Sequence, residues 1–344
     1  SSNGLDQCLR QGAEAFGWNN PKSVTSDPSR KLGRGMAMLL YRGGAGNTSA
    51  AEIRVNKAGQ VSLLMGTMDV GEGATTVLPQ LAAEVLGVGY DDVEVVSADT
   101  SKTPRSPITA GSTATFSTGT AVIQAATELR GQLVNLATVG LEVAAEQLEA
   151  LGGYIYVKDA PERRMSLAEV AGYMDKDVLT ATAEIIPGST DYIINAFGAH
   201  FVEVEVDTYT GKIYIRRYVA AHDSGRIINP RTALNQVEGG ISQMLGFTLS
   251  EELVTDEPTG VTLNGGFLEH GCPSILDYND IEVIFVDTTD PVGPMGAKAL
   301  GEPPCIAVAP AVANAIYDAI GVRFNSLPIT PDMVLDALVR DAIA

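Results

Sequence analysis

The spacing of apolar residues in the first 140 positions predicts alternating helices and strands. Leu5, Cys8, Leu9 and Phe16 recur at helical intervals, so the chain is expected to begin with an amphipathic helix. Polar residues and prolines up to residue 30 indicate a connection. The pattern then favours strands at 31–42, 51–55, 61–65 and 93–96, and helices that begin after residue 73 and at residue 121.

Residues 141–188 are predicted to form a separate module. We expect a helix that reaches Ala150, a strand at 154–157, and a second helix that begins at Ser166. The sequence Ser-Leu-Ala-Glu at that point is a capping box, in which the first and fourth side chains satisfy each other's backbone amides.

After this module the series of strands and helices starts again. Residues 200–207 alternate polar and apolar side chains and are followed by a Thr-Gly turn and residues 212–219, which predicts a hairpin with one face in solvent. A helix after residue 230 carries Gly239 and Gly240. Because glycine weakens a helix, this pair indicates close packing or a ligand against that face. A strand at 281–286 is also expected.

These patterns predict an α+β fold, with mixed sheets and packed helices in two similar lobes. The module between the two series places the lobes at residues 1–188 and 189–344.

Composition and charge exclude some classes of function. The chain has 344 residues, of which 45% are hydrophobic and 36 are glycine, as in a well-packed protein with many loops. Its formal net charge of −19 would repel a phosphate backbone, so we expect no nucleic-acid partner. No apolar run reaches the roughly 18 residues that a membrane span needs, so we expect no membrane association.

The cysteines and histidines show no metal-binding spacing. Cys8, Cys272 and Cys305 lie far apart without a CxxC pattern, so we expect no iron–sulfur cluster, structural zinc or other metal ligand in this chain. A sparse, odd set of cysteines suits the reducing cytoplasm. The three histidines are equally scattered and are expected to be structural.

Two glycine-containing segments lie between a strand and a helix. At residues 66–73 the backbone amides at the helix start can cradle an anion, although the segment matches neither the GxGxxG nor the GxxxxGK[ST] pattern. At residues 109–120, hydroxyl side chains interleaved with glycine offer further donors. The alternative for residues 66–73 is a strand–loop–helix junction that binds no ligand. The alternative for residues 109–120 is a surface loop.

Glu302 lies in a segment with the features of a catalytic site. Three glycines precede it, and Pro303 and Pro304 stiffen the chain directly after it. The run to Ile320 is apolar nearly all round, which predicts a buried helix that ends at Gly321. A rigid carboxylate with little solvent around it is suited to accept a proton. The alternative is a solvated glutamate favoured by the helix dipole.

Four motifs follow one another from residue 66 to residue 304. They are GTMDVGEG at 66–73, AGSTAT at 110–115, DSGRIINP with NQVEGGISQ between 223 and 243, and GAKALGEPP at 296–304. This series resembles the C-terminal half of the molybdopterin-binding subunit of the xanthine dehydrogenase and aldehyde oxidoreductase family. The resemblance covers nearly the whole chain and implies a cofactor-binding fold of the xanthine oxidase type.

The resemblance implies a role for individual residues. Glu302 is similar to the general base that deprotonates the hydroxyl on molybdenum, and Gln236 to a glutamine that hydrogen-bonds the pterin. The residues implied to bind the cofactor are Gly71, Glu72, Gly73, Ala110, Gly111, Ser112, Gln236 and Lys298. This sequence departs from the family pattern at Glu72, which replaces a glutamine, and at Asn235 and Ala299, which replace glycines. The first departure puts one cofactor contact in question.

The resemblance also implies a larger assembly. The cofactor would be molybdopterin with molybdenum, with or without extension to the cytosine dinucleotide. Implied partners are a separate subunit with the N-terminal molybdopterin half, an iron–sulfur subunit with 2Fe-2S clusters and an FAD subunit. The chain is then a subunit of a split enzyme or a fragment of a longer one, and should be inactive alone.

Tyr41 and Arg42 fall roughly where family members place substrate-pocket residues. An arginine there can bind a carboxylate through two hydrogen bonds, which favours an N-heteroaromatic acid such as nicotinate over a purine or a simple aldehyde. A surface arginine at a strand end is the alternative. The expected function is hydroxylation of an electron-poor ring carbon, as in nicotinate dehydrogenase. The other hypotheses are an aldehyde or aryl-CoA oxidoreductase of the same family, a non-catalytic scaffold, and a freestanding nucleotide-binding domain.

Overall fold

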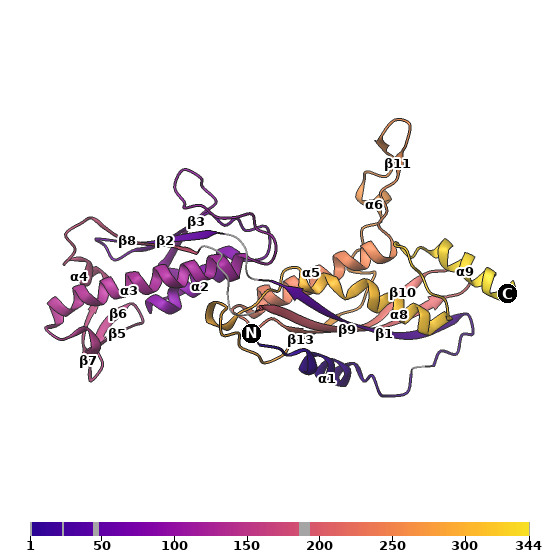
Figure 1. The fold of residues 1–344 in the computed structure, drawn as a ribbon, viewed down its shortest axis with the longest axis horizontal. Coiled ribbons are helices and arrows are strands. Elements are labelled where there is room, and N and C mark those ends of the chain that lie inside the picture. Colours follow the sequence, from indigo (N-terminus) through magenta and orange to yellow (C-terminus); the bar gives the residue numbers. More distant parts are fainter. Residues whose placement is uncertain (1, 23, 44–47, 186–192, 344) are drawn as a thin grey trace. The chain divides into compact units, whose positions relative to one another are not determined.

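The computed structural model describes residues 2–22, 24–43, 48–185 and 193–343, and the chain forms two compact units (Figure 1). The first unit comprises residues 43–194 and 290–299, and the second comprises residues 2–42, 195–289 and 300–344. These units differ from the expected lobes because the N-terminal helix and first strand pack with the later half of the chain. The glycine-containing stretch 43–46, which follows the first strand and reads as a loop, lies outside the described residues except for Gly43.

A four-stranded sheet with helices against it forms the body of the first unit. The strand order is β4 (Val93–Ser97), β3 (Val61–Met65), β2 (Ser49–Asn56) and β8 (Val178–Ile185), with only the β3–β4 pair parallel. The helices that pack with it are α2 (Ala74–Leu86) and α3 (Gly119–Leu141). The expected strands and helices of this region are confirmed, and β8 is an additional strand.

The expected helix that reaches Ala150 is wrong. Helix α3 ends at Leu141, and after a 3-10 turn at Ala145–Gln147 the chain forms β5 (Leu148–Leu151). Leu148 and Ala150 are buried while their neighbours are exposed, which is the period of a strand. Strand β5 pairs with β6 (Tyr154–Val157), and β6 with β7 (Ala160–Ser166). The capping box at Ser166 begins the short helix α4 (Leu167–Ala171), as expected.

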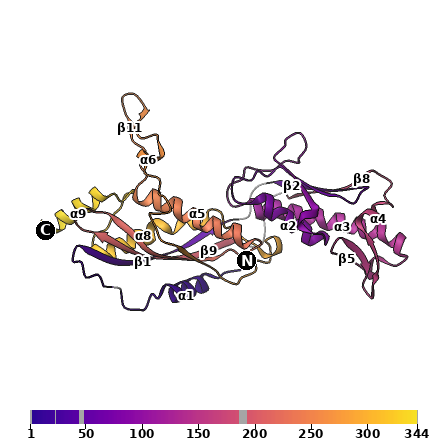
Figure 2. The ribbon, with the colours of Figure 1, turned by 180° about the vertical axis from the view of Figure 1, so that it is seen from behind.

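The second unit is a four-stranded sheet with helices on both faces. Its strand order is β1 (Arg30–Arg42), β9 (Asn195–Asp207), β10 (Ile213–Asp223) and β13 (Ile281–Phe285). Helix α1 (Leu5–Phe16) covers one face, and α5 (Pro230–Leu249) and α8 (Val308–Ile320) cover the other, as both views show (Figures 1 and 2). Helix α9 (Pro331–Ile343) follows near the C-terminus.

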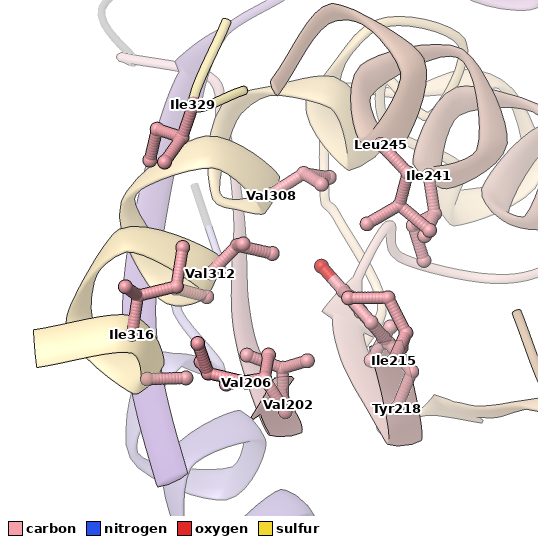
Figure 3. Close-up of a cluster of buried hydrophobic side chains, with 14 of the residues drawn as sticks. Val202, Val206, Ile215, Tyr218, Ile241, Leu245, Val308, Val312, Ile316 and Ile329 are labelled. Carbon is pink, nitrogen blue, oxygen red and sulfur yellow. The ribbon is translucent and has the colours of Figure 1, made fainter. Parts of the chain in front are cut away.

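The larger core of this unit lies between the sheet and the helices α5 and α8 (Figure 3). Each element contributes branched aliphatic side chains to it, among them Val202, Ile215, Ile241, Val312 and Ile316. Glycines on β1 let α8 approach closely. A Cβ atom added at Gly35 would lie 2.1 Å from the carbonyl oxygen of Ala311, so only glycine fits there.

Helix α8 is buried on one side only. Val308, Val312 and Ile316 are buried, whereas Tyr317 is 41% exposed, so the expectation of burial nearly all round is wrong. Among the described residues, the stretch Pro303–Ile320 has the length and composition of a membrane span. It nevertheless packs against β1 and β9, as the helix of a protein core does.

Candidate functional site

Glu302 lies at the N-terminal end of the short helix α7 (Pro303–Ile306) in the second unit. The two prolines that follow it are buried, and its carbonyl oxygen accepts a hydrogen bond of 3.0 Å from the amide of Cys305. The carboxylate is partly buried, and its Oε2 accepts a 2.5 Å hydrogen bond from the phenolic hydroxyl of Tyr41. The rigid surroundings expected for Glu302 are therefore present, together with a partner for its side chain.

Helix α5 packs directly against α7. A Cβ atom added at Gly240 would lie 3.1 Å from Pro304 and 3.3 Å from the sulfur of Cys305, which confirms that this glycine permits close packing. Gly239 faces open space instead. Gln236 precedes Gly240 by four residues, so it lies on the same face of α5, one turn earlier. The helix thus presents the predicted pterin-binding glutamine on the side that meets the Glu302 segment.

The pKa of the Cys305 thiol is affected by burial and by the neighbouring Glu302. Burial, and then the negative charge of Glu302, raise the pKa of the Cys305 thiol. Cys305 is therefore a protonated, unreactive thiol beside the carboxylate rather than a nucleophile. Arg42, adjacent to Tyr41 at the end of β1, is exposed.

The glycine loop at 66–73 is organised by its own aspartate. Asp69 accepts hydrogen bonds from the amides of Gly71, Gly73 and Thr75 and from the Thr75 hydroxyl. Burial disfavours the ionised form of Asp69, but these donors outweigh it and lower its pKa to about 2. The amides of Gly71 and Gly73 thus donate to a carboxylate of the protein itself. In this structure they are not available to bind an external anion, as the sequence had suggested.

The two predicted cofactor segments of the first unit lie together. The hydroxyl of Thr67 bonds to those of Ser106 and Thr118 at 2.8 Å each, and Thr118 also bonds to Ser49. The Thr109 hydroxyl donates to the carbonyl of Met68 at 2.7 Å. These hydroxyl contacts fix the loop at 66–73 against the segment at 104–118.

A third segment, residues 290–299, which contains the predicted residue Lys298, packs against the segment around Phe116 and Gly119. A Cβ atom added at Gly119, the first residue of α3, would lie 3.4 Å from Pro294, and one added at Gly293 would lie 3.3 Å from Phe116. Lys298 is 5% exposed. The first unit therefore brings together the segments of Gly71, Glu72, Gly73, Ala110, Gly111, Ser112 and Lys298. Tyr41, Arg42, Gln236 and Glu302 belong to the second unit.

Comparison with known proteins decides the family. Residues 11–279 match the model of the molybdopterin cofactor-binding domain. The chain belongs to this family.

Proteins similar to this chain include a molybdenum-binding subunit and a subunit of a dehydrogenase complex. The chain is 34% identical over 346 residues to the xanthine dehydrogenase molybdenum-binding subunit of Escherichia coli O157:H7, covering 96% of this chain and 45% of that subunit. It is 32% identical to subunit gamma of the 6-hydroxypseudooxynicotine dehydrogenase complex of Paenarthrobacter nicotinovorans, covering 89% and 39%. The chain thus spans less than half the length of these relatives.

A solved structure has the same fold. Quinoline 2-oxidoreductase from Pseudomonas putida 86 superposes with a TM-score of 0.82 at 28% identity, over 97% of this chain and 44% of that one. This confirms the expected α+β cofactor-binding fold.

The molybdopterin cofactor-binding domain offers polar groups that fit such a cofactor. One carboxylate oxygen of Glu72 accepts from the amide of Val70 at 2.8 Å, while the other, Oε1, is buried and has no hydrogen-bond partner among the described residues. Beside it, a Cβ atom at Gly71 would meet nothing within 4 Å. A buried acceptor without a partner suits an N–H donor of a ligand, which a pterin provides.

The sequence did not reveal a buried cluster of His200, Tyr218 and His222. The Nε2 atoms of the two histidines lie 2.9 Å apart, and Nδ1 of His200 is 2.9 Å from the Tyr218 hydroxyl. Burial, and for His200 the neighbouring histidine, lower both histidine pKa values, that of His222 to about 4, and burial raises the pKa of Tyr218. Tyr218 and His222, four residues apart on β10, share one face of that strand, and the expected hairpin put His200 on the neighbouring strand; this was the available signal.

Proposed function

We propose that this chain contributes the general base, Glu302, to a molybdenum hydroxylase that oxidises an electron-poor carbon of an N-heteroaromatic substrate. The observation that carries the proposal is the hydrogen bond from Tyr41 to the half-buried Glu302 carboxylate, next to two buried prolines. A proton acceptor must be held in a fixed direction to be efficient, and this arrangement holds it.

Four residues of this chain have separate proposed roles in the reaction. Glu302 accepts a proton at its carboxylate, and Tyr41 orients that carboxylate through Oε2. Gln236 on α5 and the buried Oε1 atom of Glu72 are the groups that would hold the cofactor by hydrogen bonds. Molybdopterin with molybdenum, when bound, supplies the two-electron oxidation that no side chain can perform.

The reaction requires partners. Introducing oxygen from water into a C–H bond releases two protons and two electrons, and Glu302 takes only one of the protons. The electrons need acceptors, for which we propose 2Fe-2S clusters and FAD in partner subunits. The rest of the molybdenum-binding subunit, which the relatives carry beyond the aligned part, is the first partner.

N-heteroaromatic substrates are favoured by two observations. The names of two similar proteins refer to compounds of this class, quinoline and a nicotine derivative. Arg42 is an exposed cation beside Tyr41 and can pair with a substrate carboxylate. An aldehyde oxidoreductase is the second candidate, since a 35% identical relative from Escherichia coli carries that name.

The test of the base is Glu302→Gln in the purified complex. The amide keeps the shape of the side chain but cannot take up a proton, so turnover should fall by about 10²–10⁴-fold while molybdenum content stays unchanged. Unchanged turnover with full molybdenum loading would reject the proposal.

Arg42→Gln tests the substrate class. The KM for nicotinate should rise at least about tenfold, because one charge-assisted pair is lost. The KM for quinoline, which has no carboxylate, should stay the same. An equal effect on both substrates would remove Arg42 from the substrate site.

A further inference from the structure

An arm of the second unit exposes apolar side chains to an unusual degree. This arm, residues 251–277, follows α5 and contains the two-residue strands β11 (Thr255–Asp256) and β12 (Val261–Thr262) and the short helix α6 (Phe267–His270). Figures 1 and 2 both show it standing away from the sheet of its unit. Its most exposed large apolar residues, between 63% and 91% exposed, are Leu253, Leu263, Phe267, Leu268, Ile275 and Leu276.

The arm has a defined internal structure. The amide of Leu263 donates to the carbonyl of Val254 at 2.8 Å, and the amide of Val254 donates to Oδ1 of Asn264 at 2.9 Å. At its base, the Ser250 hydroxyl donates to the carbonyl of Gly271 at 2.6 Å. Backbone and side-chain bonds thus hold the arm in shape while its apolar side chains face water. Such a surface is typical of a binding site for another polypeptide.

Its charge identifies the chemistry of the partner. The arm contains six acidic residues and neither lysine nor arginine. A second copy of the arm would bring like charges together, and the whole chain carries a net charge of −19. The complementary surface is therefore apolar with a basic border.

We propose that the arm docks onto the part of the molybdenum-binding subunit that the relatives carry beyond the segment they share with this chain. That part makes up more than half of each relative, so a large polypeptide surface is available for it. The contact would be an apolar centre from Phe267, Leu268 and their neighbours, surrounded by ion pairs from the arm's carboxylates. This inference rests on the proposed assembly of the complete enzyme.

The experiment compares two cysteine reporters in the purified complex. Leu268→Cys lies on the arm, where the residue is 89% exposed, and Leu151→Cys lies in the first unit, where it is 64% exposed. N-ethylmaleimide should label Leu151→Cys at least tenfold faster than Leu268→Cys when the arm is covered. Equal labelling of both reporters in the complex would overturn the proposal.

Cross-linking identifies what covers the arm. A carbodiimide that joins carboxylates to lysines should link Asp256, Glu257 or Glu269 to the segment outside the shared part. Phe267→Ser with Leu268→Ser should abolish this link, and the matched pair Leu151→Ser with Tyr209→Ser should retain it. Links only to a second copy of this chain, or only to an iron–sulfur or FAD subunit, would contradict the assignment.

Molybdenum content separates this inference from the proposed function. A complex with full molybdenum and Glu302-dependent turnover but an accessible Leu268→Cys reporter rejects the docking surface alone. A protected and cross-linked arm in a complex whose turnover survives Glu302→Gln rejects the proposed base alone.

Discussion

The phenolic hydroxyl of Tyr41 donates to Oε2 of Glu302, although 261 positions separate the two residues in the chain. The end of β1 and the start of α7 therefore meet within the second unit. We propose that through this contact Tyr41 acts on the base, in addition to or instead of the substrate-pocket role implied by the family resemblance. It orients the carboxylate that we propose as the base.

Removal of the Tyr41 hydroxyl should affect the chemical step. Tyr41→Phe keeps the ring but releases the carboxylate, and kcat should fall by about tenfold to a hundredfold because a reacting group is less well placed. Steady-state kinetics of the complex measure this effect, and Tyr209→Phe, which alters an exposed tyrosine, is the control. A higher KM with unchanged kcat would instead support the original substrate-pocket role.

Asp69 should hold the glycine loop at 66–73 in place. Asp69→Asn weakens its hydrogen bonds with Gly71, Gly73 and Thr75, and should lower the free energy of unfolding of the first unit by about 1–3 kcal/mol. It should also lower molybdenum content. The matched control is Asp99→Asn, whose side chain likewise caps a turn through Ser101. Equal molybdenum loading in both variants would argue against a role for the Asp69 contacts in cofactor binding.

The acid stability of the same loop follows from its pKa. Because the folded pKa of Asp69 is about 2 and its ordinary value is 3.8, its contribution is present above pH 3.8 and is lost as the pH falls toward 2.

The contact between β1 and α8 should tolerate no side chain at Gly35. In Gly35→Ala the new Cβ would meet the backbone of Ala311 and Ala315, so α8 must shift, and stability should fall by about 3 kcal/mol. Gly131→Ala offers the opposite control, since Gly131 is exposed within α3 with nothing within 4 Å. That change should stabilise the protein by about 0.5–1 kcal/mol. Thermal unfolding of both variants gives the comparison.

The buried histidines should make the second unit sensitive to acid. Both histidines stay neutral in the folded protein but take up a proton when it unfolds. The free energy of unfolding is therefore highest above pH 6.5 and decreases as the pH falls toward the folded pKa of His222, about 4. The slope is up to about 1.4 kcal/mol per pH unit for each histidine. His222→Gln should flatten the dependence of the unfolding midpoint on pH between 4 and 6.5, and His270→Gln should not.

Much of the second unit could be predicted because its side chains alternate. Residues 200–207 form part of β9 as expected, since every second side chain enters the core beneath α8. The expectation that the other face lies in solvent is wrong, because α1 covers it and buries Phe201. The failure at 141–150 has a local cause. Glu142 adopts a left-handed conformation, with φ of 53°, and ends α3. Glycine is the usual sequence signal for such a helix end, and it is absent at this position. A helical pattern was therefore extended through a strand.

The candidate site could be predicted only in part. Family motifs gave the segments, but hydrogen bonds between distant residues are not encoded in any local pattern. Two examples are the hydrogen bond that Asp69 accepts from Gly71 and the hydrogen bond between the hydroxyls of Thr67 and Thr118. Both depend on tertiary packing. The histidine pair likewise arises from strand register, because Ala220 lies opposite His200 and so brings His222 diagonally across from it.

The division of the chain into units also constrains how the protein is made. Residues 43–194 are synthesised early, but residues 290–299, which pack on the start of α3, leave the ribosome only after most of the second unit has been translated. The surface around Phe116 and Gly119 therefore stays exposed during synthesis until residues 290–299 have been translated and can pack on it. A nascent chain stalled before residue 290 would hold an incomplete first unit, with the place for Pro294 still open.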